Sequence, residues 1–169
     1  MISARLSPTP PAGWRWLAGV DTDPRFALGQ WERGRAALVR LGCCFDAVRV
    51  ADDGETAAII ADLRAAGRPV GPVLVDWATR TSTWLVPVRR LPLWDLRGTE
   101  LLTGDDETPA ILMPPPAPGE TGGMSWAVRP DGSGRLTCHL DLAVALRRVR
   151  PRLRGPIGSA RSGGGRKAS

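Results

Sequence analysis

Two groups of acidic residues belong to the type that binds a divalent metal ion. Asp21 and Asp23 stand at positions i and i+2 after the apolar segment WLAGV, and Asp52 and Asp53 stand side by side after FDAVRVA. An i, i+2 pair on a strand points to one face and could share a metal ion. Pro24 makes Asp23 equally suitable as a helix N-cap. Because Asp52 and Asp53 are adjacent and precede a glycine, we interpret them as a turn at the acidic start of a helix.

The sequence contains one histidine and three cysteines that could take part in catalysis or metal binding. Catalysis of the Ser/His/Asp kind would need His139, the only histidine, and in a helix Asp141 lies about 200° round the axis from it. We interpret His139 as a residue of a first helical turn. Cys43, Cys44 and Cys138 lack the spacing of zinc ligands, so we predict no zinc site. Their odd number also argues against a disulfide framework and favours a reducing compartment.

The positive charge of the chain is concentrated near its end. The formal net charge is +6, yet eight basic residues and no acidic residue follow Leu146, so the rest of the chain sums to −2. Such a segment can neutralise several phosphates of a nucleic acid, or it can be a solvated arm that binds nothing specific. DNA is therefore a predicted partner, and the candidate contacts are Arg147, Arg148, Arg150, Arg152 and Arg154.

Apolar periodicity indicates the elements that carry these residues. Alternation predicts a strand over 45–50, and helical spacing predicts a helix over 55–66. Further predictions are a β-hairpin (VLVDWA and TWLVPV, joined by TRTS), two short strands (PAILMPPP and MSWAVRP) and a final helix (CHLDLAVALRRVRPRL). Upstream, GWRWLAGV is interpreted as an extended segment or a short turn. Residues 24–42 are interpreted as a helix that its glycines weaken or divide.

This order of elements predicts an α+β fold, a two-layer domain with a mostly antiparallel sheet and helices packed on one side. The chain has 169 residues, 43% of them apolar, which suits one domain over 13–150. Residues 1–12 are predicted to be a disordered N-terminal segment and 151–169 a basic flexible tail. No apolar run approaches the ~20 residues of a membrane span, and no signal peptide is recognisable, so we expect a cytoplasmic protein without membrane contact.

Several short segments have a familiar order: GWRWLAG, FDAVRV before a helix, GPVLVD before TWLVPV, AILMPPP, and SWAVRPDG. Together they span about Gly13 to Val149. In this order the chain resembles the N-terminal bifunctional DNA primase/polymerase domain, in the short and divergent form found in GC-rich bacteria. The resemblance implies an RRM-like antiparallel sheet that carries polymerase acids and a nucleotide-contacting histidine on its strands.

The positions that match the family's motifs hold different residues here. The first motif is a strand ending in Asp, an apolar residue and Asp, and the matching positions hold Arg49 and Ala51. Thr83 stands where the second motif has His, and Asp95 in WDLRG matches the third acid. Because one acid cannot hold two metal ions, the resemblance implies a degenerate domain without catalysis or cofactor. Such a protein would act as an accessory or nucleic-acid-binding protein.

Two other functions stay open. An active metal-dependent nucleotidyl transferase would use Asp21, Asp23 and Asp95 to bind Mg²⁺. A protein-interaction module with an incidental basic tail would need none of these residues, and the sequence identifies no protein partner for it.

Overall fold

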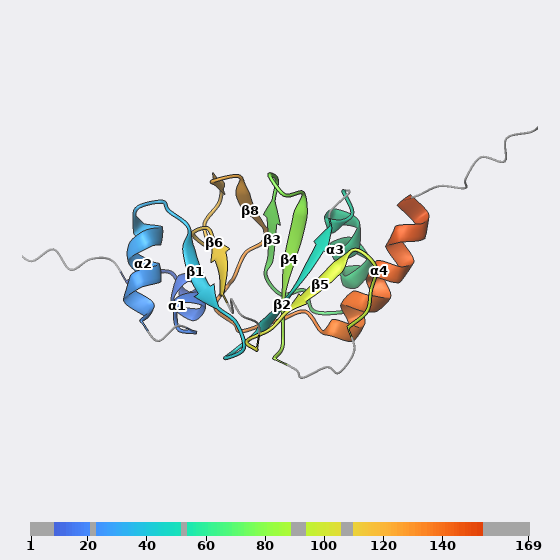
Figure 1. Cartoon of the computed structure of the whole chain (residues 1–169), viewed down its shortest axis with the longest axis horizontal. Coiled ribbons are helices and arrows are strands. Elements are labelled where there is room, and N and C mark those ends of the chain that lie inside the picture. Colours follow the sequence, from blue (N-terminus) through green and yellow to red (C-terminus); the bar gives the residue numbers. More distant parts are fainter. Residues whose placement is uncertain (1–8, 21–22, 52–53, 89–93, 106–109, 154–169) are drawn as a thin grey trace, which may run out of the picture.

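The computed structural model of the protein (Figure 1) describes residues 9–20, 23–51, 54–88, 94–105 and 110–153. Its helices are α1 (Ala12–Ala18), α2 (Pro24–Glu32), α3 (Thr56–Ala65) and α4 (His139–Leu153). Its strands are β1 (Ala37–Arg40), β2 (Asp46–Ala51), β3 (Val73–Asp76), β4 (Thr81–Val86), β5 (Thr99–Leu102), β6 (Ala110–Met113), β7 (Glu120–Thr121) and β8 (Met124–Val128). Most of the predicted segments 1–12 and 151–169 lie outside the described residues.

The centre of the molecule is a six-stranded sheet with the order β5-β2-β4-β3-β8-β7, in which all neighbours are antiparallel. The predicted α+β class with an antiparallel sheet is therefore confirmed. The predicted hairpin is β3 and β4, and the Asp76 carboxylate accepts the backbone N–H of Ala78 and of Thr79 in the turn between them. In this Asx-type turn the aspartate side chain supplies the hydrogen bonds that hold the reversal of the chain.

Helices α3 and α4 lie together on one side of this sheet (Figure 1). They bury a core in which Val48 and Val50 of β2 and Trp84 of β4 meet apolar side chains of both helices. On α4 these side chains form an apolar stripe, which consists of Leu142, Ala145, Leu146 and Val149. Burial of each large side chain stabilises the fold by roughly 1.5–3 kcal/mol, so this stripe fixes which face of α4 turns inward.

A second core lies on the opposite face of the sheet. Ala47, Leu74 and Leu85 of the sheet share it with α1, α2 and a two-stranded ribbon formed by β1 and β6. The prediction of a helix through residue 42 was wrong in its second half, where β1 forms. Gly34, at φ 67°, follows the end of α2, and residues 37–40 alternate between buried and exposed. Residues 13–20, predicted as extended or turn, contain most of α1 instead.

Tryptophan side chains hold the proline segment 113–116 in place. Trp31 donates its indole N–H to the Met113 carbonyl at 3.0 Å, and Trp14 donates to the Pro116 carbonyl at 3.1 Å. Trp126 donates to the two proline carbonyls between them. Because proline has no N–H, a proline run cannot continue a strand ladder, and these indoles supply the hydrogen bonds that a neighbouring strand would otherwise give.

Two of the chain connections between the ribbon and the sheet touch at Gly42 and Gly104. A Cβ atom on Gly42 would lie 2.4 Å from the Gly104 Cα, and one on Gly104 would lie 2.6 Å from the Gly42 Cα. Gly42 also has φ 85°. Only glycine allows two backbones to come this close, so these positions set how the ribbon sits on the sheet.

None of the helices in the described segments is long and apolar enough to cross a lipid bilayer.

Candidate functional site

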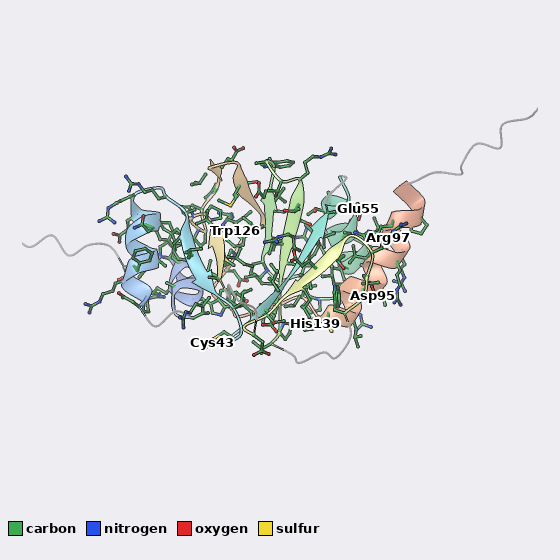
Figure 2. All side chains as sticks on the ribbon, viewed as in Figure 1. Cys43, Glu55, Asp95, Arg97, Trp126 and His139 are labelled. Carbon is green, nitrogen blue, oxygen red and sulfur yellow. The ribbon has the colours of Figure 1, made fainter. Side chains whose placement is uncertain are left out.

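Of the acids predicted for magnesium, the two that the structure describes, Asp23 and Asp95, are not brought together. Asp23 caps α2, where its carboxylate accepts the N–H of Arg25 at 3.1 Å and Pro24 begins the helix. Asp95 is exposed and lies near α4, whereas α2 is at the other end of the molecule (Figures 1 and 2). Asp21, like Asp52 and Asp53, lies outside the described residues. Within the described segments, no three His, Cys, Asp or Glu side chains are placed to hold a metal ion.

The positions matched to the polymerase motifs share one face of the sheet. Arg49 of β2 pairs in register with Thr83 of β4, and Ala51 pairs with Thr81. On the neighbouring strand β5, Glu100 binds the Arg49 guanidinium with an N–O distance of 2.8 Å. These two side chains are 40% and 59% exposed, so the pair contributes about 1 kcal/mol at most. This face therefore holds an ion pair at the positions where the resemblance would lead us to expect carboxylates.

Arg150, predicted to contact nucleic acid, is bound within the protein. Its Nε atom lies 2.9 Å from the Glu55 carboxylate, and the side chains of this pair are 18% and 9% exposed. The guanidinium also donates to the backbone carbonyls of Arg97 and Gly98. The side chain thus ties α4 to the start of α3 and to the loop before β5, which gives it a structural role.

The other predicted arginines have different surroundings. Arg148 is half-exposed and lies 3.7 Å from the Asp62 carboxylate of α3. Arg147 is exposed and forms no ion pair with any described residue. Arg154 and the side chain of Arg152 are outside the described part of the chain. Among the described members of this set, Arg147 is therefore the one that is exposed and has no ion-pair partner.

The histidine and cysteine residues form no joint site. His139 begins α4, as predicted, and is buried with its ring 6.2 Å from that of Trp94. Cys43, Cys44 and Cys138 are free thiols. Partial burial and the neighbouring Cys43 thiol raise the pKa of Cys44, which disfavours its reactive thiolate form.

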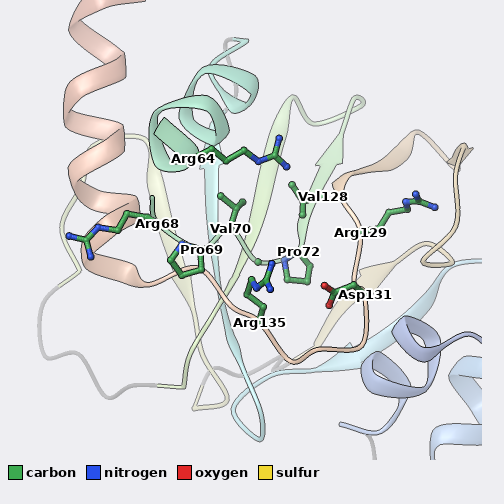
Figure 3. A pocket seen from close by; sticks show the side chains of 10 residues that line it. Arg64, Arg68, Pro69, Val70, Pro72, Val128, Arg129, Asp131 and Arg135 are labelled. Atoms are coloured by element: carbon green, nitrogen blue, oxygen red, sulfur yellow. The ribbon is translucent and has the colours of Figure 1, made fainter. Parts of the chain in front are cut away.

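A cluster of arginines around a cavity of about 250 Å³ was missed by the sequence analysis (Figure 3). We call it the arginine pocket. Its charged lining residues are Arg64, Arg68, Arg129, Asp131 and Arg135, and its remaining lining residues are Pro69, Val70, Gly71, Pro72 and Val128. The only signal in the sequence is that two of these arginines precede proline turns, in GRPVGP and VRPDGSGR. Those turns are separated by most of the sheet, so their meeting could not be anticipated.

A close backbone contact brings the two turns together. The Gly71 N–H donates to the Thr137 hydroxyl at 2.9 Å, and a Cβ atom on Gly71 would lie 2.6 Å from the Leu136 Cα. On the other turn, the Asp131 carboxylate accepts the N–H of Ser133 at 2.8 Å and its hydroxyl at 2.6 Å. These two bonds lower the pKa of Asp131, so its carboxylate stays ionised. The pocket therefore has a fixed frame.

Comparisons with models of known protein families, with curated proteins and with solved structures gave no match.

Proposed function

We propose that the protein is a nucleic-acid-binding accessory domain, built on a primase/polymerase-like scaffold that has lost its catalytic residues. The observation that carries the proposal is the exposed Arg147 on α4, which has no ion-pair partner among the described residues. The helix leads into residues 151–169, which add five basic residues and no acidic one. An exposed guanidinium group without a carboxylate partner, followed by a basic segment of sequence, favours contact with phosphates, largely independent of base sequence.

The absence of catalysis in this proposal is supported by the Arg49–Glu100 pair. Arg49 and Thr83 are register partners on the face where the resemblance would place a metal-binding acid and a histidine. An arginine at that point would repel a divalent metal ion. The nucleotidyl transferase alternative is not favoured, because Asp23 and Asp95 belong to opposite ends of the molecule. No contact of the described residues favours a protein-interaction module.

The test is DNA binding by the full chain as a function of salt concentration, measured by fluorescence anisotropy with single- and double-stranded oligonucleotides. Truncation after Leu146 is unsuitable, because it would remove the buried Val149 and the Glu55 partner Arg150. The informative variant is the triple substitution Arg147→Gln, Arg152→Gln, Arg154→Gln.

If all three side chains contact phosphates, the slope of log K against log salt should fall by roughly 2–3 in the triple variant. The matched control removes three exposed arginines elsewhere, with Arg25→Gln, Arg35→Gln and Arg40→Gln. Failure of the wild-type protein to bind DNA at low salt would refute the proposal. An equal loss of slope in the control would show that only total charge matters, and would refute the assigned contact surface.

A further inference from the structure

We propose that the arginine pocket binds the phosphate groups of a small phosphorylated ligand, such as pyrophosphate or the phosphates of a nucleotide. This site is separate from the basic residues of α4. It is formed by the last turn of α3, the loop after it, the end of β8 and the loop that leads to α4 (Figure 3).

The charge of the pocket is the first support. Arg64, Arg129 and Arg135 form no ion pair with a described carboxylate, and Arg68 lies 3.5 Å from Asp141. Four guanidinium groups against the carboxylates of Asp131 and Asp141 leave two net positive charges. Like charges that line one pocket repel each other, and a bound anion offsets this repulsion because it attracts each guanidinium group. Guanidinium groups match phosphate oxygens because they donate two parallel hydrogen bonds.

The binding of Asp131 within its own loop is the second support. Its Oδ1 atom accepts both hydrogen bonds from Ser133, which orients the carboxylate toward its own turn. Arg135 lies near enough to help lower the pKa of Asp131, but the hydrogen bonds from Ser133 are the larger cause and no ion pair joins the two side chains. Arg64, Arg129 and Arg135, which form no ion pair with a described carboxylate, can then donate to a ligand.

The size and lining of the pocket define the ligand class. About 250 Å³ is below the usual range for drug-sized ligands, so the volume suits two or three phosphates or one mononucleotide. The uncharged lining consists of glycine, two prolines and two valines, and none of the described lining residues is aromatic. No aromatic side chain of the described lining can stack on a nucleobase, so the phosphates would supply most of the affinity.

The arrangement favours a small ligand over a nucleic-acid backbone. In Figure 3 the Arg64 and Arg135 side chains lie over the middle of the view near Val70 and Pro72, whereas the guanidinium groups of Arg68 and Arg129 point outward in opposite directions. A strand of nucleic acid is bound by a positively charged groove that tracks successive phosphates. Two central arginines, Arg64 and Arg135, that do not form a continuous track suit phosphates clustered on one small molecule.

The experiment is calorimetric titration of the full chain with pyrophosphate and with ATP at low ionic strength, with sulfate as a generic anion. We expect both phosphorylated probes to bind more tightly than sulfate. Arg135→Gln and Arg64→Gln should each weaken binding by roughly 10- to 100-fold, as expected for loss of a charge-assisted hydrogen bond. Arg35→Gln removes an exposed arginine outside the pocket and should leave the affinity within about twofold.

Three results would overturn the proposal: no binding of either probe, equal weakening by Arg35→Gln, or no preference over sulfate. DNA binding measured on the same variants shows whether the phosphates belong to a small molecule or to a nucleic-acid backbone. If Arg135→Gln weakens DNA binding while pyrophosphate does not bind, the pocket holds a nucleic-acid backbone and the small-ligand proposal fails. Because the α4 arginines are tested by their own variants, failure here leaves the DNA-binding proposal standing, and the reverse also holds.

Discussion

Replacing Arg150 with methionine should destabilise the protein strongly, whereas the same substitution at Arg147 should not. Both residues belong to the predicted DNA-binding set, and both lie on α4 one turn apart. Arg150 contacts Glu55 and two backbone carbonyls, whereas Arg147 is exposed and contacts no described carboxylate. Methionine is a good helix former, so helix propensity changes little in either variant.

The burial of the Arg150–Glu55 pair sets the expected magnitude. A fully exposed ion pair contributes about 0–1 kcal/mol, and breaking a fully buried one costs about 3–5 kcal/mol. With side chains 9% and 18% exposed, this pair lies near the buried limit, although water reaches part of the guanidinium. We therefore expect Arg150→Met to lower the free energy of unfolding by about 3 kcal/mol, and Arg147→Met to change it by less than about 0.5 kcal/mol.

Urea denaturation followed by tryptophan fluorescence measures both changes. The variant Glu55→Gln and the double variant with Arg150→Met complete a double-mutant cycle, which isolates the pairwise contribution from losses of packing. A coupling energy of about 1–3 kcal/mol is expected, because the two side chains are in direct contact.

Equal stability of the two methionine variants would refute this reasoning, as would a coupling energy near zero. Either result would mean that the pair is hydrated in solution and that Arg150 is as available to DNA as Arg147. DNA-binding measurements on Arg150→Met should therefore be made under conditions in which the variant is shown to be folded.

Two further predictions concern the core. Trp31→Phe should lower the free energy of unfolding by about 1–3 kcal/mol, because it leaves the buried Met113 carbonyl without its indole donor. Trp77 is 60% exposed, so Trp77→Phe should lower the free energy of unfolding by less than about 0.5 kcal/mol. Urea midpoints compare the two, and similar values would contradict the proposed role of the indole bond. Gly42→Ala should cost roughly 3 kcal/mol or more because its Cβ would strike the Gly104 backbone. Gly67 also has a positive φ, but a Cβ atom there would meet open space, so Gly67→Ala should lower the free energy of unfolding by only about 1–2 kcal/mol through backbone strain. Equal losses of stability at Gly42 and Gly67 would exclude the steric explanation.

The elements that the sequence predicted correctly are those with a local signal. The β3–β4 hairpin and α3 have clear periodicity and clear stops, and the prolines mark the end of β6. The sequence predicts a helix over 37–40 because Leu38 and Leu41 continue the helical spacing of the preceding apolar residues. The strand conformation of this segment depends on pairing with β6, which lies some seventy residues away. Tertiary pairing therefore overrode local propensity there.

The arginine pocket was not predictable for a related reason. Its residues come from the end of α3, the end of β8 and the two loops that follow them, none of which has a chemical motif, and the two loops meet at the contact between Gly71 and Thr137. An arginine beside a proline turn has the sequence pattern of an ordinary exposed residue. The pocket exists only because β3 and β8 are neighbours in the sheet, and strand order is a global property that no local spacing reveals.

Net charge located the basic segment of α4, but the rotation of the helix decides what each arginine can do. At about 100° per residue, Arg147 lies about 150° from the centre of the apolar stripe, so its side chain projects into solvent. Arg148 and Arg150 lie about 90–110° from that centre, on opposite flanks, which lets them reach Asp62 and Glu55. These angles follow from helical periodicity and the positions of the apolar residues, and they separate an arginine that can contact a phosphate from two that anchor the helix. A run of basic residues on a packed helix is therefore not a uniform binding surface, and its capacity for phosphates is smaller than its formal charge.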